Sequence, residues 1–291
     1  MKKSRIFLVS LVLMAAFVLG YIASDITIDM GSKAAVIPIK GTISPGSVQA
    51  SPSSLQKLIK KAENDGVDAY VFQINSPGGT VVASRQMANI IEDIKKPTVC
   101  QLQDIAASGA YWIASSCDTI VSDPLTITGS IGVTASYLEY SEHLREEGIE
   151  YVRLVKGEFK DMGSPYRNIT ERERKFFNQS LRKVYQSFVE EVRESRPINK
   201  TQLDEITSGR TFLGSVAKKK GMVDVLGGKD KVKEILENRL DSKVSFKNYR
   251  NNIGTLGLLD FIGNSQAKKE GQEASSFVIE RGFPRLLAMY F

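Results

Sequence analysis

Ser108 is the residue of this sequence whose setting best suits covalent chemistry. It follows an extended stretch and opens a run of small residues, 109–116, that is typical of a tightly packed helix. At a helix start, the unpaired backbone N–H groups and the positive end of the dipole stabilise negative charge, such as the charge that acyl transfer develops on an oxygen. Ser108 is therefore a candidate nucleophile. The structural alternative is a helix cap or a point of close helix packing.

A serine hydroxyl needs a base to remove its proton, and the sequence offers few. His143 is the one histidine, and it lies in a charged helical stretch, residues 141–145, where we expect it to be solvated. A single histidine also excludes a multi-histidine metal site. The base must then be a lysine or a carboxylate.

Lys160 differs from most lysines of the chain because it lies in an irregular stretch, with Phe159 before it and glycine and proline after it. A lysine has a reference pKa of about 10.4, so a lysine base must be desolvated or placed near positive charge. These features make Lys160 the candidate base. The alternative is a surface loop lysine that pairs with Asp161.

Paired glycines follow another extended stretch, in the run Asn75-Ser76-Pro77-Gly78-Gly79-Thr80. Because glycines have no Cβ atoms, another molecule can approach the main chain there and meet its N–H groups. An ordinary glycine turn is the alternative. The spacings of phosphate-binding glycine loops are missing, which argues against a nucleotide.

The elements that must position these residues alternate along the chain. Extended runs cover residues 34–40, 67–75, 98–103, 119–122 and 151–155, and helical runs cover residues 53–64, 81–95, 106–116 and 170–196. Repeated strand and helix units of this kind predict an α/β fold with a largely parallel sheet. The last helix has Thr170 as its expected cap and two glutamates in its first turn.

The amino terminus predicts a membrane anchor. Lys2, Lys3 and Arg5 precede an uncharged apolar run, residues 6–23, which would span about 27 Å as a helix. The positive flank should stay in the cytoplasm, so we expect a single-pass protein of the cell membrane whose remaining chain lies on the outer side. A cleaved signal peptide is the alternative, although the small-residue cleavage pattern is poor.

Composition and cysteine usage limit the remaining possibilities. Lys and Arg outnumber Asp and Glu by 39 to 33, but basic residues are mixed with acids, so nucleic acid is not an expected partner. Cys100 and Cys117 have neither metal-ligand spacing nor a redox motif. Buried free thiols are the default interpretation, and an oxidising compartment would allow a disulfide.

The chain divides into four expected segments. An anchor over residues 1–24 and a linker over 25–33 precede one folded domain over 34–250. A polar, partly mobile tail over 251–291 ends in apolar residues that we expect to dock on this domain or on a neighbouring subunit.

Taken together, the motifs resemble the signal peptide peptidase A family in type, order and separation. The resemblance rests on the runs Ile74-Asn75-Ser76-Pro77-Gly78-Gly79, Ala107-Ser108-Gly109-Ala110-Tyr111, Thr128-Gly129-Ser130-Ile131-Gly132-Val133 and Phe159-Lys160-Asp161. It resumes in residues 164–165, 168–170, 209–212 and 221–224 and covers about residues 34–240. One copy of the domain corresponds to the short form of the family. Ala110 and Trp112 depart from the commoner glycine and tyrosine.

The resemblance implies the Clp protease/crotonase-like fold, a superhelix of repeated β-β-α units. It implies a serine endopeptidase that hydrolyses remnant signal peptides and other hydrophobic peptides without a metal or an organic cofactor. Ser108 takes the position of the nucleophile, Lys160 that of the general base, and Ser130 that of the residue that orients the lysine. The N–H groups of Gly79 and Gly109 take the positions of the oxyanion hole.

The family also implies a dome-like homo-oligomer, with an octamer as the leading expectation, in which the serine and lysine of one site can come from adjacent subunits. Two other functions fit the same fold. A crotonase-type enzyme also holds an oxyanion with two N–H groups, but its acyl-coenzyme A substrates belong to the cytoplasm, whereas the expected topology puts this site outside. An inactive membrane scaffold is the second alternative, and the presence of both Ser108 and Lys160 argues against it.

Overall fold

The computed structural model describes Met14 and residues 31–251. The expected anchor and linker, apart from Met14 and residues 31–33, and the expected tail, apart from residue 251, lie outside the described residues. Within the described part, no helix has the length and apolar character needed to cross a membrane. The chain divides into two compact units, Met1–Tyr249 and Arg250–Phe291. The candidate site residues all lie in the first unit.

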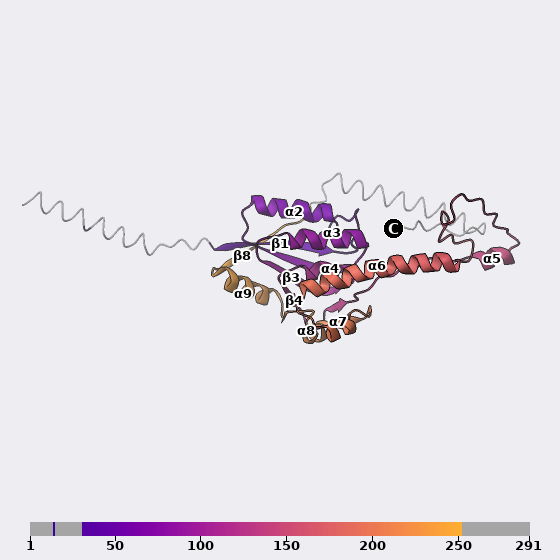
Figure 1. The fold of residues 1–291 in the computed structure, drawn as a ribbon. Coiled ribbons are helices and arrows are strands. Elements are labelled where there is room, and N and C mark those ends of the chain that lie inside the picture. Colours follow the sequence, from indigo (N-terminus) through magenta and orange to yellow (C-terminus); the bar gives the residue numbers. More distant parts are fainter. Residues whose placement is uncertain (1–13, 15–30, 252–291) are drawn as a thin grey trace, which may run out of the picture. The chain divides into compact units, whose positions relative to one another are not determined.

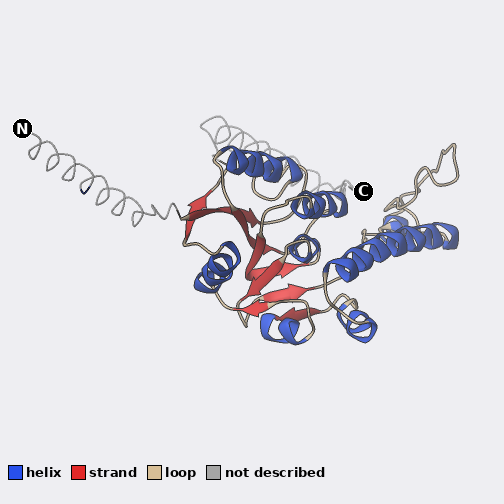
Figure 2. Ribbon diagram, turned by 60° about the vertical axis from the view of Figure 1, so that its left-hand side comes forward, coloured by secondary structure: helices blue, strands red, loops and turns tan. Residues whose placement is uncertain are grey.

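A mostly parallel sheet forms the centre of the first unit (Figures 1 and 2). Its strands are β1 (Ser32–Lys40), β2 (Ala69–Ser76), β3 (Thr98–Ala107), β4 (Thr119–Ser122), β5 (Ile127–Gly129), β6 (Thr211–Leu213), β7 (Val225–Leu226) and β8 (Val244–Asn248). The strand order is β6-β5-β3-β2-β1-β8, with β4 beside β3 and β7 beside β4. Of the described pairs, β5 with β6 is the antiparallel one. The prediction of an α/β fold with a largely parallel sheet is confirmed.

Helices pack on both faces of this sheet, as Figure 2 shows. They are α2 (Pro52–Asn64), α3 (Val81–Glu92), α4 (Gly109–Ser115), α5 (Ser141–Glu146), α6 (Glu171–Ser195), α7 (Lys200–Ile206), α8 (Gly214–Lys219) and α9 (Lys229–Leu240). Successive residues of β2 enter different cores, because side chains alternate across a strand. Phe72 joins the larger core with α2, α3 and α4, and Val71 joins a smaller one with α9.

The long helix α6 confirms the prediction for residues 170–196. Thr170 is its N-cap, and the capping box is complete because the Thr170 hydroxyl accepts from the Glu173 N–H while the Glu173 carboxylate accepts from the Thr170 N–H. Near its C-terminal end, Phe188 and Val192 are buried in the larger core. In Figure 1, α6 runs from the region of α4 toward α5.

Two element predictions are wrong. Residues 151–155 do not form a strand, since no described strand pairs with them, and Val152 and Leu154 are 68% and 90% exposed. The helix expected from residue 106 begins at Gly109 instead. Ala106 and Ala107 extend β3, because they pair with Thr128 and Gly129 of β5.

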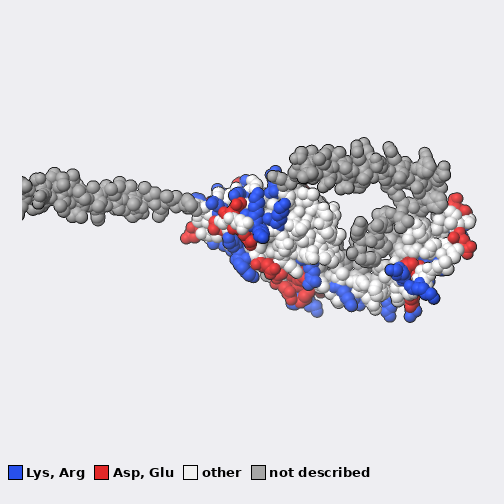
Figure 3. Space-filling view, turned by 90° about the horizontal axis from the view of Figure 1, so that it is seen from above, with Lys and Arg blue, Asp and Glu red and all other residues white. Residues whose placement is uncertain are grey.

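On the face drawn in Figure 3, basic and acidic side chains are interspersed over the described residues. This is the mixed charge pattern that the sequence predicts. His143 is exposed on α5, as expected.

Candidate active site

Ser108 occupies the turn between the last residue of β3 and the first residue of α4. Its φ of 55° and ψ of −126° lie where residues other than glycine are strained. Hydrogen bonds on both sides hold this conformation: the Ser108 N–H donates to the Gly129 carbonyl at 2.7 Å, and the Ser108 carbonyl accepts from the Tyr111 N–H at 2.9 Å. The side chain is half-buried, and its hydroxyl makes no hydrogen bond within the described part of the chain. The Ser108 side chain thus lies on a sharp strand-to-helix turn at the end of β3.

The glycine pair packs directly against this turn. A Cβ atom built on Gly78 would lie 2.9 Å from the Ser108 Cβ, and one built on Gly109 would lie 2.1 Å from the Ser84 hydroxyl oxygen. Glycine is therefore required here for close approach.

The N–H groups of Gly79 and Gly109 are available beside Ser108. Ile43 bonds the residues on either side of Gly79, because its N–H donates to the Gly78 carbonyl and its carbonyl accepts from Thr80, each at 2.9 Å. Gly109 stands at the first position of α4, where an N–H has no partner in the helix. Neither glycine N–H donates to another group within residues 31–251. Two such donors beside a serine can stabilise an oxyanion.

Ser130 lies next to Ser108. Ala107 and Gly129 are register partners in the parallel pair of β3 and β5, so the serines that follow them emerge side by side. Ser130 also has a positive φ, 53°, and its N–H donates to the Arg210 carbonyl at 2.8 Å. Asp241 is the other non-glycine residue with a positive φ in the described part. Backbone strain thus marks both serines at the same edge of the sheet.

Lys160 lies in the loop that precedes α6, and its side chain is exposed. The amino group forms no hydrogen bond or ion pair within the described part of the chain. Asp161 does not pair with it, because the Asp161 carboxylate is bonded by Arg153 at 2.7 Å and Arg167 at 3.0 Å. These arginines, Arg153 first, hold the pKa of Asp161 well below its usual range. The alternative of a Lys160–Asp161 surface pair is therefore not what the structure shows.

Within one chain, α6 separates the surroundings of Lys160 from those of Ser108. Near one end, the Phe176 ring contacts Phe159 with centroids 5.8 Å apart. Near the other, Phe188 stacks on Trp112 of α4 with centroids 4.3 Å apart. Phe176 and Phe188 are twelve positions apart on the helix, which corresponds to about 18 Å. The structure thus brings Ser108, Ser130, Gly79 and Gly109 together and leaves Lys160 with the far part of α6.

Glu191 is a supporting residue that the sequence analysis missed. Its carboxylate accepts from the Trp112 indole N–H and from Arg85 Nε, both at 2.7 Å. Arg85 belongs to α3, which follows Gly79, and Trp112 belongs to α4, which begins at Gly109. Glu191 therefore ties together the two helices that follow the available N–H groups. A glutamate in a charged helix gives no sequence signal of this role.

Residues 221–224, one of the segments that resemble the family, contact the helix that follows the Ser108 turn. The Tyr111 hydroxyl donates to the Met222 carbonyl at 3.0 Å, and burial raises the pKa of Tyr111. An Asp224 carboxylate oxygen accepts from the Ile120 N–H at 2.7 Å, and the other is bonded by Arg196. These contacts hold α4 and β4 in place.

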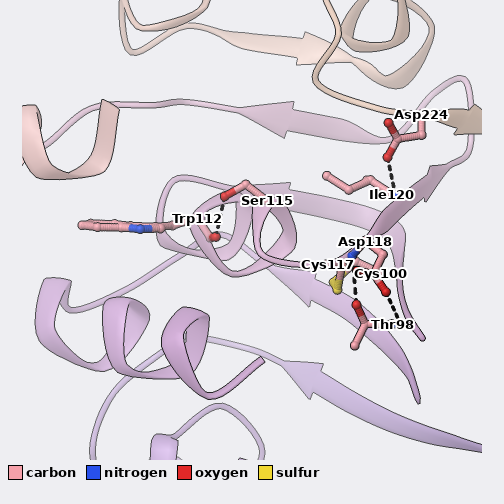
Figure 4. The surroundings of a disulfide bond; sticks show 8 residues. All are labelled: Thr98, Cys100, Trp112, Ser115, Cys117, Asp118, Ile120 and Asp224. Carbon is pink, nitrogen blue, oxygen red and sulfur yellow. Dashed lines mark hydrogen bonds between the residues drawn. A yellow bond between two sulfur atoms is a disulfide. The ribbon is translucent and has the colours of Figure 1, made fainter. Parts of the chain in front are cut away.

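A disulfide joins Cys100 and Cys117, so the default interpretation of free thiols is wrong. Cys100 lies on β3 and Cys117 follows α4, and their Cα atoms are 5.8 Å apart (Figure 4). Thr98 and Asp118 exchange two hydrogen bonds, each of 2.9 Å, which bring the two ends of the segment together. The closed loop contains Ser108.

Comparison with known proteins identifies the family. The sequence pattern of peptidase family S49 matches residues 90–243, which are 154 of the 291 residues. The chain belongs to peptidase family S49. A second pattern, the N-terminal domain of NfeD1b, matches residues 33–139 of this S49 peptidase.

Several curated relatives of the S49 peptidase are proteases by name. A Methanocaldococcus jannaschii protein whose name includes the word protease is 32% identical over 72% of this chain and 69% of its own length. Protease 4 of Haemophilus influenzae is 31% identical over 73% of this chain and 36% of its own length. The chloroplastic serine protease SPPA of Arabidopsis thaliana is 30% identical over 65% of this chain and 29% of its own length. The chain thus spans about a third of the length of the last two relatives.

A solved structure shares the fold. A mutant of the 1510-N membrane-bound stomatin-specific protease, in complex with a substrate peptide, superposes with a TM-score of 0.51 and 18% identity. The match covers 81% of this chain and 99% of that one. The S49 peptidase therefore has the mixed α/β fold of this protease.

Proposed function

We propose that this S49 peptidase is a membrane-bound serine endopeptidase with Ser108 as nucleophile and Lys160 as general base. The strained Ser108 turn carries the proposal, because it sets a hydroxyl beside the available N–H groups of Gly79 and Gly109. Membership of a peptidase family and the name of the Arabidopsis serine protease support the same reaction.

In the proposed reaction, neutral Lys160 accepts the Ser108 proton while Oγ attacks the carbonyl carbon of a peptide bond. The negative charge that moves to the carbonyl oxygen is stabilised by the N–H groups of Gly79 and Gly109. Protonated Lys160 then gives its proton to the leaving amine, and an acyl-enzyme remains. Water, deprotonated by Lys160, hydrolyses this ester and regenerates Ser108. Ser130, beside Ser108, would orient the lysine by a hydrogen bond.

We infer that the lysine of each site comes from a neighbouring copy of the chain. The separation along α6 supports this arrangement, because Lys160 sits with Phe176 and the Ser108 turn sits with Phe188. The segment 138–159 and the start of α6 also expose large apolar side chains, which are Leu138, Ile149, Tyr151, Val152, Leu154, Phe159 and Phe176. A second copy packed on them would remove this surface from water. A dome-like octamer is the assembly that we propose.

The substrates that we propose are remnant signal peptides and other hydrophobic peptides, cut on the outer side of the cell membrane by an enzyme anchored through residues 1–24. The fold is then the Clp protease/crotonase-like superhelix. Neither a metal nor an organic cofactor takes part in this mechanism.

The test uses the full chain, purified in detergent, with casein or a fluorogenic peptide as substrate. Ser108→Ala and Lys160→Ala should each abolish cleavage while folding and assembly persist. Co-assembly of the two inactive variants in equal amounts should restore roughly a quarter of the activity, since one site in four then combines an intact serine with an intact lysine from the next copy. Near-normal cleavage by either single variant would end the proposal. A co-assembled mixture without activity would place both residues of a site in one chain.

A serine-directed phosphonate separates the alternatives. A peptidase should be labelled, whereas a crotonase-type enzyme should bind acyl-coenzyme A without labelling, and an inactive scaffold should do neither.

A further inference from the structure

The residue after Lys160 is held by two arginines. Arg153 donates from Nη2 to Asp161 Oδ1 and from Nε to Asp161 Oδ2, both at 2.7 Å. Arg167 donates from Nε to Asp161 Oδ2 at 3.0 Å and from Nη2 to the Asp161 carbonyl at 3.2 Å. Both carboxylate oxygens of Asp161 are therefore occupied by guanidinium groups.

The second arginine connects Asp161 to the start of α6. Arg167 also makes a two-point contact with Glu173, at 2.9 and 2.5 Å. The Glu173 side chain is only 3% exposed, and Arg167, followed by hydrogen bonds from Thr170, holds the pKa of Glu173 at about 2. Arg153, Asp161, Arg167 and Glu173 thus alternate in charge and anchor the loop on the first turn of α6.

Both acids of the loop 156–165 are held in this way. Glu158 pairs with Arg172 of α6 at 2.5 Å, as Asp161 does with its two arginines. By contrast, the two lysines of the loop, Lys156 and Lys160, form no ion pair within residues 31–251. In this loop, the carboxylates are therefore paired with arginines, whereas the lysine amino groups are not paired with acids of the described chain.

We propose that Asp161 is a positioning residue for Lys160, and that Arg153 and Arg167 keep its carboxylate from pairing with the lysine. This inference rests on the proposed function, in which Lys160 must be neutral to act as a base. A carboxylate beside an amino group stabilises the ammonium form and raises the pKa of the lysine. A carboxylate bonded to two guanidinium groups raises the pKa of a neighbouring lysine much less. Asp161 in this state still fixes the backbone that carries Lys160.

Arg153→Gln tests this role in the full-length assembled enzyme. The Asp161 side chain is 14% exposed, but it does not lose all its partners in this variant, because Arg167 still binds one of its oxygens. The other oxygen then becomes available to Lys160. We expect the midpoint of the rise of kcat/KM with pH to move upward by about 0.5 to 1 unit. The limit at high pH can fall as well, because Arg153 also bonds the Glu158 carbonyl of the loop, so the midpoint is the quantity that tests the inference. Well below that midpoint, activity should fall about three- to tenfold.

Two further arginine variants make the result specific. Arg174→Gln removes the same charge from α6, where Arg174 pairs with Glu171 and not with an acid of the loop. Its profile should move much less than that of Arg153→Gln. Arg153→Lys retains a cation for Asp161 and should stay close to the wild-type profile. An unmoved midpoint in Arg153→Gln, or an equal shift in Arg174→Gln, would overturn the inference.

Asp161→Asn tests the anchoring separately. The limiting kcat should fall severalfold because the loop is held less firmly, and the midpoint should not rise because no carboxylate remains. A limiting kcat equal to that of the wild type would remove the positioning role. The proposed function fails independently, if Lys160→Ala retains activity, whereas an inactive Lys160→Ala with an unmoved Arg153→Gln profile refutes only this inference.

Discussion

Replacing both disulfide cysteines, in Cys100→Ala/Cys117→Ala, should destabilise the domain by an amount that follows from the loop that they close. The two residues are 17 positions apart in the sequence. The chain-entropy relation for such a loop gives a loss of unfolded-state entropy of about 11 cal/mol/K, which corresponds to about 3 kcal/mol at 25 °C. For a domain of more than 200 residues, this predicts a Tm lower by about 6 to 12 °C.

The loss should also reach the active site, because the loop contains the Ser108 turn. After both cysteines are replaced, the hydrogen bonds between Thr98 and Asp118 still hold the two ends of the segment together, so we expect the fold to survive at 25 °C. Activity should then decline at a lower temperature than in the wild type, in step with unfolding.

Scanning calorimetry of the wild type and the double variant, each with and without a reductant, measures this effect. Reductant should lower the Tm of the wild type toward that of the variant and leave the variant unchanged. The reasoning is refuted if unfolded, unreduced wild type titrates with two free thiols, or if the variant melts within about 2 °C of an oxidised wild type.

Three other predictions concern single contacts. Gly79→Ala would place a Cβ atom 1.9 Å from the Ile43 carbonyl oxygen, so the loop must move and kcat should fall about 100-fold or more. Gly46→Ala is the control, because nothing lies within 4 Å of its Cβ, and its activity should be near that of the wild type. Equal effects of the two variants in an activity assay would contradict this. Glu191→Ala should lower the free energy of unfolding by about 1 to 3 kcal/mol in a denaturant titration, because Trp112 and Arg85 lose their acceptor. Replacing the exposed Glu190 by alanine should lower it little. A larger loss in Glu190→Ala than in Glu191→Ala would exclude the connection between α3 and α4. Glu173, with a pKa of about 2, stabilises the folded state fully above its ordinary pKa and loses this contribution as pH falls toward 2. In Glu173→Gln, the free energy of unfolding should therefore fall less steeply with decreasing pH. A fall as steep as in the wild type would contradict the assignment.

Features with a local cause were predictable from the sequence. The helix over residues 170–196 was predicted to within one residue at each end, and its start followed from Thr170 as a cap with two glutamates in the first turn. Ser108 was placed correctly at a helix start, because small residues suit close packing there. The glycine pair was identified because a missing Cβ permits close approach to the main chain, and in the structure Ile43 approaches Gly79 in this way.

Features that depend on distant partners were not predictable. The run Tyr151-Val152-Arg153-Leu154-Val155 has the composition of a strand, but it meets no neighbouring strand in the described chain, and Arg153 bonds to Asp161 instead. The Cys100–Cys117 disulfide requires β3 and the end of α4 to meet, and spacing alone does not show that. The closeness of Ser108 and Ser130 likewise follows from the register of β3 and β5.

The most direct test of the central claim is covalent labelling of the full-length assembled enzyme with a serine-directed phosphonate, followed by mass spectrometry of its peptides. We expect one labelled residue, Ser108, and labelling slowed at least 100-fold in Lys160→Ala, in line with the contribution of a general base. A label on another serine, or an equal rate of labelling in Lys160→Ala, would contradict the claim.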